Sequence, residues 1–331
     1  MRVTAALIVA AGVIAPSISV RGDNALAEVS AQELADALSS SRDKLRANAQ
    51  VEFDVLRWHF EGGTEPQGVA EILALAEKSK LQPVRASAEE AKAAAESYKR
   101  AVIELLGQTD VQHWIATFLD GSIKFEEEVD LDRLQQLRGL AQGQNATPRL
   151  DSRRQWLFTG QNVYAYGDGA NAVTVSPLEP TTTTYPVSLD VLNPAFALRP
   201  GAASAWEGAS IKEVAGSPGT YEFSFSKTTA NTMLVSKSGE NVGMRMLTVQ
   251  TPGGYGIQRF YTDLVEDVLS PVLVPFAVTS IARSKGSTEI QLFALRKVEI
   301  GKVTEDAMVL NVQKSARIPQ EAVAGPVKVG D

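Results

Sequence analysis

Apolar and polar side chains alternate over short stretches through most of the chain after Val111, which is typical of β-strands with one buried face. Residues 153–177 predict three short antiparallel strands, with turns at 159–161 and 167–169. In the second turn, Asp168-Gly169 is expected to supply the positive φ of a tight hairpin. Similar strands are predicted at 111–119, 122–129, 220–227, 231–237, 243–250, 255–264, 270–284 and 288–301. Repeated strands at short spacing predict one large antiparallel sheet.

The part of the chain before residue 108 also contains helical patterns. Ser30-Ala-Gln-Glu33 is a capping box, and the leucines after it recur at helical spacing. A strand pattern at 51–60 follows, where a change of apolar phase at Leu56 predicts a bulge or a strong twist. Residues 64–107 carry two more capped helix patterns, so we predict a helical hairpin inserted between two strands.

The first 27 residues have the three parts of a secretory signal peptide. They begin with a basic residue, Arg2, continue with an uncharged apolar run at 3–16, and end with an A-x-A site at 25–27. The apolar run is shorter than the about 20 residues that span a bilayer. We therefore predict cleavage before Glu28 and a periplasmic or secreted protein, with no transmembrane segment after removal of the signal. A retained membrane anchor is the alternative.

Charge and cysteine content narrow the range of functions. The net charge of −7 argues against nucleic acid or an anionic membrane surface as a partner. Without cysteine, the chain has no disulfide, no thiol nucleophile, no cysteine zinc site and no lipid-bearing cysteine. A chain of 331 residues can nevertheless be stable through its core alone, because proteins of this size bury about 75% of their unfolded surface.

Few residues suggest catalysis or metal binding. The two histidines, His59 and His113, would need a carboxylate as third metal ligand, and core positions on strands are the alternative. The acidic run at 126–132 could offer oxygen ligands to calcium, but it lacks the alternating Asp/Asn and the Gly of a binding loop. S-x-x-K occurs at Ser41 and Ser224, in neither case with the partner motifs of a serine–lysine enzyme. We expect a non-enzymatic protein without metal or cofactor.

Three pieces of the chain resemble the periplasmic lipoprotein-carrier superfamily. They are the helix and strand at 33–55, the Arg-rich strand and hairpin at 152–169, and the late strands from Tyr261 to Leu310. In that family an R-x-x-x-aromatic strand precedes a D/N-G-x-x-hydrophobic-x-Y segment, and residues 160–166 occupy its place here. The resemblance implies an α+β fold, in which a curved antiparallel sheet forms an open, LolA-like half-barrel with helices packed on or over its concave face.

The chain shows neither an internal repeat nor a linker, so we expect a single domain at 28–313 and a C-terminal tail at 314–331. In the carrier fold, an arginine on the strand that corresponds to 153–158 can donate hydrogen bonds to carbonyl groups of a lid. These hydrogen bonds hold the cavity closed. Arg153 or Arg154 is the counterpart by position, with a surface role as the alternative. The candidate residues for a hydrophobic cavity are Phe53, Trp58, Trp114, Phe118, Trp156, Phe158, Tyr164 and Tyr166.

These features predict an exported binding protein of the cell envelope whose ligand is hydrophobic, either a lipid or the acyl chain of a lipoprotein. Burial of an acyl chain gains about 0.8 kcal/mol per CH₂. The alternative is a structural or sensory envelope domain that binds another protein, with the concavity of its sheet filled by its own helices.

Overall fold

The computed structural model describes residues 31–61, 67–79, 82–109, 111–129, 151–179, 185–186, 210–225, 231–250, 254–266, 269, 272–323 and 325–330. The signal peptide predicted at 1–27 lies outside these residues. Within the described part of the chain, no helix combines the length and the apolar character needed to cross a membrane.

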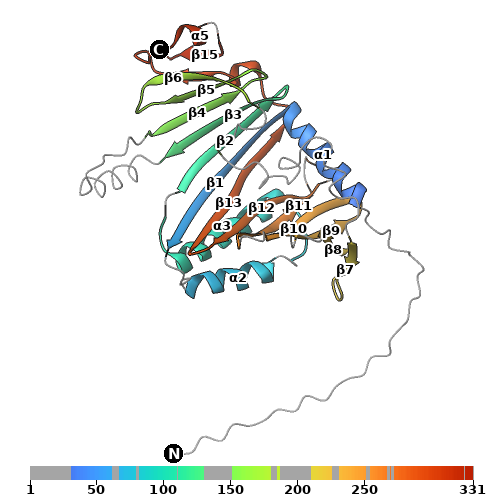
Figure 1. Ribbon diagram of the computed structural model, residues 1–331. Helices are drawn as coiled ribbons and strands as arrows, with labels where there is room; N and C mark the ends of the chain where they lie inside the picture. The colour runs from blue at the N-terminus through green and yellow to red at the C-terminus, as the bar shows by residue number, and fades with distance from the viewer. Residues whose placement is uncertain are drawn as a thin grey trace, which may run out of the picture.

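Most of the described strands belong to one antiparallel sheet, in the order β6-β5-β4-β3-β2-β1-β13-β12-β11-β10-β9-β8-β7. Their bounds are β1 Asn48–Glu61, β2 Val111–Leu119, β3 Ser122–Val129, β4 Arg153–Phe158, β5 Asn162–Gly167, β6 Ala172–Pro177, β7 Ser210–Glu213, β8 Thr220–Phe225, β9 Asn231–Ser238, β10 Asn241–Gln250, β11 Gly256–Val265, β12 Val274–Ser284 and β13 Ser287–Ile300. Consecutive strands are neighbours, except that β1 pairs with β13 and that β6 and β7 lie at opposite edges. The sheet is strongly curved and does not close into a barrel (Figure 1), which confirms the predicted fold class.

Helices lie on both faces of this sheet. Helix α1, Ala31–Ala47, crosses the concave face, whereas α2, Gln67–Ser79, and α3, Ala88–Leu106, lie on the opposite face (Figure 1). The helical hairpin predicted between the first two strands is therefore present, but outside the concavity. Its helices approach closely at Gly68, where a Cβ would lie 2.4 Å from the carbonyl oxygen of Leu105.

Strand β1 shows why the apolar phase changes at Leu56. Residues 53–56 are all buried, so this part of the strand is covered on both faces. A bulge was predicted in β1 at Leu56, and this position is wrong. The register between β1 and β13 shifts between Glu52 and Phe53, and the extra residue, Arg296, lies on β13. A strand buried on both faces needs no alternation, so its apolar phase carries no register information.

The tight turns are partly as predicted. The β2–β3 hairpin turns at Asp120 and Gly121, whose φ values are 49° and 80°. In the β5–β6 hairpin, the positive φ (47°) falls on Asn171 instead of Gly169, and the Asn171 backbone N–H donates to the Gly167 carbonyl oxygen at 2.8 Å. Asparagine tolerates this conformation better than most residues.

The segment after Gln313 is not an extended tail. It contains α5, Gln320–Val323, and β15, Val327–Val329, which pairs in parallel with β14, Leu310–Val312. These elements pack against β4–β6 in a second apolar cluster made of Leu157, Tyr164, Tyr166, Val173, Leu310, Val312 and Ala322. The side-chain amide of Gln155 extends the contact, since its Nε2 donates to the Asn311 carbonyl and its Oε1 accepts from the Asn311 N–H.

Candidate ligand-binding face

The register of β1 divides the sheet into two faces. The concave face, which carries Phe53 and is crossed by α1, is called the inner face. The opposite face, which carries Asp54, is called the outer face. Residues opposite each other in an antiparallel pair point to the same side, so the pairing assigns every strand residue to a face.

The outer face is held to α3 by polar side chains. Lys99 Nζ donates to Asp54 Oδ2 at 3.0 Å, and the Tyr98 hydroxyl lies 2.8 Å from Thr279 Oγ1. Burial raises the pKa of Tyr98 to about 12, so this hydroxyl stays protonated. These contacts fix the α2–α3 hairpin to the sheet.

Asp54 is a structural site that the sequence analysis missed. Its side chain is 1% exposed, and its carboxylate lies near Lys99, His113 (3.3 Å) and Arg296 (2.9 Å). Burial alone would raise the pKa of Asp54, but hydrogen bonds from His113 and Lys99 and the charges of Lys99 and Arg296 lower it to about 2. One carboxylate within an otherwise apolar strand stretch was the available signal.

Five of the eight residues predicted to line the ligand site lie on the inner face. They are Phe53, Trp114, Phe118, Trp156 and Phe158. The rings of Trp114 and Trp156 stack, with centroids 5.7 Å apart and an interplanar angle of 21°. The pairing of β1 to β4 therefore brings together residues that are up to 105 positions apart in the sequence.

Phe125 and Tyr185 extend this group, although the sequence analysis did not single them out. The Phe125 ring is edge-on to Phe158 at 5.8 Å, and the Tyr185 ring contacts both, at 5.7 Å from Phe125 and 4.9 Å from Phe158. We use the name aromatic row for the inner-face residues Phe53, Trp114, Phe118, Phe125, Trp156 and Phe158.

The other three predicted lining residues lie on the outer face. Trp58 lies at the α3 end of the outer face, and its Nε1 donates to the Gly107 carbonyl at 3.0 Å. Tyr164 and Tyr166 pack against the C-terminal segment. These three side chains therefore do not share a surface with the aromatic row.

Arg153 and Arg154 point to opposite faces, as neighbours on a strand must. Arg153 is on the outer face and donates from Nη2 to Glu126 Oε1 at 2.6 Å. Arg154 is on the inner face, where its Nε donates to Asp151 Oδ2 at 2.9 Å and its Nη1 lies 3.7 Å from Glu127 Oε2. Among the described residues, the partners of both are carboxylates of the sheet region and not carbonyl groups of a helix.

Glu127 marks a polar end of the aromatic row. The residue is 5% exposed. Burial raises the pKa of its carboxyl group above the ordinary value, and the charges of Arg154 and Arg57 oppose part of this rise. Arg57, Gln112 and Gln291 share this end of the inner face by register. The apolar part of the inner face thus begins beside a buried carboxylate.

Helix α1 contacts the sheet through Leu38, Ser41 and Leu45, which are 0–1% exposed. The Ser41 hydroxyl has no hydrogen-bond partner among the described residues. The C-terminal end of the helix is anchored to the β2–β3 turn, since the Asp120 and Gly121 N–H groups donate to the Ala47 and Arg46 carbonyls. The C-terminal end of the helix is therefore tied to the sheet by two backbone hydrogen bonds.

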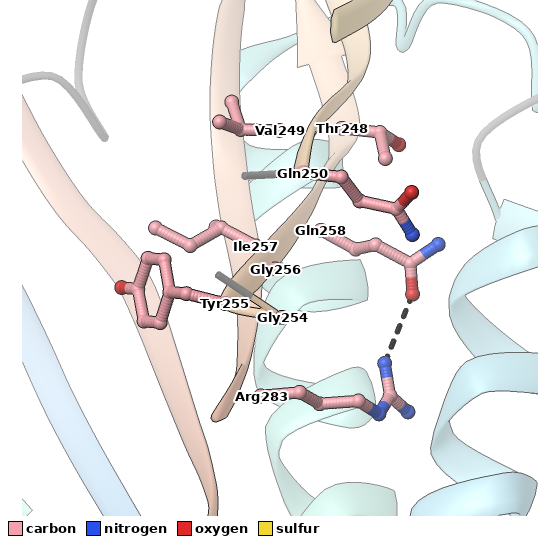
Figure 2. A pocket seen from close by; sticks show the side chains of 9 residues that line it. All are labelled: Thr248, Val249, Gln250, Gly254, Tyr255, Gly256, Ile257, Gln258 and Arg283. Carbon is pink, nitrogen blue, oxygen red and sulfur yellow. Dashed lines mark hydrogen bonds between the residues drawn. The ribbon is translucent and has the colours of Figure 1, made fainter. Parts of the chain in front are cut away.

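The N-terminal half of α1 borders a cleft. Its volume is about 490 Å³, and it lies between the helix and the β9–β10 hairpin, with Asp36, Ser40, Lys237 and Glu240 in its lining. A second pocket, of about 370 Å³, lies at the tip of the β10–β11 hairpin (Figure 2). There Arg283 Nη1 donates to Gln258 Oε1 at 3.1 Å. Neither pocket is lined by the aromatic row.

The two histidines are separated by the sheet. His113 is on the outer face beside Asp54, while His59 is on the inner face and lies 3.4 Å from Glu61. They cannot share a metal ion. Within the described ranges, no group of three His, Cys, Asp or Glu side chains is placed to hold one.

No protein-family model matches the sequence, and no curated protein matches it. Among solved structures, the chain is similar to an outer membrane lipoprotein-sorting protein domain from Vibrio parahaemolyticus, with a TM-score of 0.40 and 6% identity over 84% of this chain and 97% of that one. It is also similar to an uncharacterized conserved protein from Thermus thermophilus, with a TM-score of 0.32 and 8% identity over 86% and 96% of the two chains. The first description names the family that the sequence resembles. Because both TM-scores are low, function must be argued from the sheet itself.

Proposed function

We propose that this protein is an exported, non-enzymatic binding protein whose inner face takes a hydrophobic ligand, either a lipid or the acyl chain of a lipoprotein. Helix α1 is the cover that the ligand displaces. The proposal rests on one observation above all: the inner face carries an apolar surface, and Leu38 and Leu45 are the buried leucines among the described side chains of α1.

That apolar surface extends over the strands from β4 to β8. By register the aromatic row continues through Phe293 on β13 and Val278 on β12 to Tyr261 on β11, Leu247 on β10 and Phe223 on β8. Ionisable side chains on β1 to β4, such as Arg57 and Glu127, lie at one end of this surface. A long apolar surface with a polar end suits an amphiphile whose acyl chain lies along the sheet.

Two features make α1 suited to movement. Its buried stripe includes the Ser41 hydroxyl, and a buried polar group without a partner costs about 1–3 kcal/mol. The helix is tied to the sheet at its C-terminal end, while its N-terminal half borders the cleft beside the β9–β10 hairpin. Displacement would therefore swing the N-terminal half outward about the Ala47 end.

The gain from an acyl ligand exceeds the loss of these helix contacts. Burial of each CH₂ gains about 0.8 kcal/mol, so a chain of about 14 carbons gains roughly 10 kcal/mol before the cost of immobilisation. Loss of the contacts of Leu38 and Leu45, the buried leucines among the described side chains of α1, costs about 1.5–3 kcal/mol each. A long acyl chain can thus replace α1 on the inner face, whereas a short one cannot.

The test is a titration of the purified protein with a fluorescent fatty-acid probe, together with native mass spectrometry for co-purified lipid. We expect binding in the wild type, and weaker binding per folded molecule in Trp156→Ala and Phe158→Ala, which should behave alike. Leu157→Ala is the matched control: Leu157 is 1% exposed but packs on the outer face, so this variant should lose stability and retain binding.

One observation favours the alternative of a closed, protein-binding domain. Phe53, Trp114, Phe118 and Phe158 are only 0–4% exposed, as in a filled core. If the wild type binds no apolar probe and all three alanine variants unfold the protein, the inner face is a permanent core. The function would then reside on the surface of the molecule.

A further inference from the structure

A polar cleft lies on the outer face, at the end of the sheet formed by β8 to β10. Its volume is about 510 Å³. One wall is the α2–α3 linker, with Gln82 and Val84, and the other is the β7–β8 turn at 216–220. Arg245 and Ser236 complete the lining from the sheet. This cleft and the aromatic row lie on opposite faces.

Arg245 is the unusual residue of this cleft. It sits at a register shift between β10 and β9, between Met244 and Met246, and it is 4% exposed. Its Nε donates to Ser236 Oγ at 2.8 Å, whereas its Nη1 is buried and has no hydrogen-bond partner in the part of the chain that the structure describes. A guanidinium carries five N–H donors and remains charged, so an unpartnered nitrogen is costly.

The carboxylate behind the cleft does not satisfy this cation. Asp263 Oδ1 accepts two hydrogen bonds from Arg85, one from Nε at 3.1 Å and one from Nη2 at 2.7 Å. Its Oδ2 accepts from Thr262 Oγ1 at 3.2 Å. Glu213, the last residue of β7, is exposed and accepts from the Gly219 N–H of the turn at 3.0 Å. Arg85 Nη1 also lies 3.7 Å from Glu90 Oε1, so the carboxylates of Asp263 and Glu90 both pair with Arg85, whereas Nη1 of Arg245 has no partner among the described residues.

Burial lowers the pKa of Arg245 to about 10, and the charge of Asp263 opposes this effect. The guanidinium is therefore still protonated at neutral pH. A buried arginine fork is well matched to the paired oxygens of a phosphate or a carboxylate.

We propose that this cleft binds an oxyanion group through Arg245. The cleft is far larger than the about 30 Å³ that a water molecule occupies in the liquid, and it falls in the range of small-molecule sites. Its occupant is thus an oxyanion carried on a larger polar group, either a soluble phosphate ester or a lipid headgroup. The inference is independent of an apolar ligand on the inner face.

The experiment is calorimetric titration of the full protein with inorganic phosphate and with glycerol 3-phosphate at low ionic strength. The wild type should bind, and Arg245→Met should weaken binding by about tenfold or more. Arg283→Met is the matched control, because Arg283 also lies on the outer face, on β12, and is hydrogen-bonded to Gln258. It should change affinity by less than about twofold. Equal binding by the wild type and Arg245→Met, or no binding by the wild type, would overturn the proposal.

Since Arg245 is buried, two further measurements keep the test valid if Arg245→Met does not fold. Arg245→Lys retains the charge but not the fork, and it should bind phosphate more weakly than the wild type. In the wild type, phosphate should slow amide hydrogen exchange at 216–220; an unchanged exchange pattern would count against the site. Vesicles of phosphatidylcholine with and without phosphatidylglycerol separate the two sources. Arg245-dependent binding to the anionic vesicles indicates a headgroup, and binding of only the soluble esters indicates a soluble ligand.

Discussion

Replacement of Asp54 by asparagine tests whether the outer helices are fixed to the sheet by charge. The side chain is 1% exposed and lies within 3.3 Å of groups on Lys99, His113 and Arg296. The lowering of its pKa from 3.8 to about 2 corresponds to about 2 kcal/mol of stability at neutral pH. We therefore expect Asp54→Asn to reduce the free energy of unfolding by about 2 kcal/mol or somewhat more, because the variant leaves cations without their carboxylate.

The pH dependence gives the sign of the effect. A carboxyl group with a lowered folded-state pKa stabilises the protein above its unfolded pKa of about 3.8, and this stabilisation is lost as the pH falls through about 2. The difference in unfolding free energy between wild type and Asp54→Asn should thus be largest above pH 5 and should shrink toward pH 2. Urea denaturation at a series of pH values measures it.

Glu52→Gln is the control on the same strand and the same face. Glu52 is half-buried, and its carboxylate lies 3.8 Å from Lys297 Nζ, so the change should cost less than about 0.5 kcal/mol. The electrostatic account of how α3 is held would be refuted if Asp54→Asn lost less unfolding free energy than the Glu52→Gln control. It would also be refuted if the loss caused by Asp54→Asn did not vary with pH.

Three further changes test separate parts of the structure. Ser41→Ala removes the unpartnered hydroxyl, so α1 should pack more tightly on the sheet. Thermal denaturation should show a gain in stability of about 1 kcal/mol, and the fatty-acid probe should bind more weakly. Unchanged stability and binding would refute the idea that this hydroxyl weakens the packing of α1. Gly68→Ala forces a Cβ against the backbone of α3 and should cost about 1–3 kcal/mol, with loss of the α2–α3 contact in hydrogen exchange; a neutral result would show that the helices separate freely. Tyr164→Ala should expose the C-terminal segment to proteolysis without loss of probe binding, and intact resistance to protease would contradict its role in the second cluster.

The sequence predicted the elements well, because alternation and helix caps are local signals. Ser87 caps α3, one of the two capped helices predicted within 64–107, and the strands predicted at 111–119 and 122–129 form a hairpin that turns at Asp120-Gly121. The distribution of aromatic residues between the two faces was not predictable in the same way. Trp58 follows a stretch of β1 that is buried on both faces, and such a stretch has no polar side to reveal its orientation.

Two other features depend on contacts between distant segments. The apolar residues after Gln313 lack a period, and they are ordered by their packing on Tyr164 and Tyr166 and by backbone hydrogen bonds to β6 and β14. Arg245 lies in a strand pattern that gives no sign of a buried charge. Its burial follows from the register shift between β9 and β10 and from the linker after α2. Neither signal is present in a local window of sequence.

The most direct test of the central claim is to lock α1 to the sheet. Ser40 and Glu240 are exposed and line the same cleft, and the chain has no cysteine, so Ser40→Cys/Glu240→Cys can be joined by a short bismaleimide linker. The fatty-acid probe should bind the unlinked double variant as it binds the wild type, and binding should be lost in the linked protein. If the linked protein binds the probe with unchanged affinity, α1 is not a displaceable cover, and the inner face is not reached by moving it.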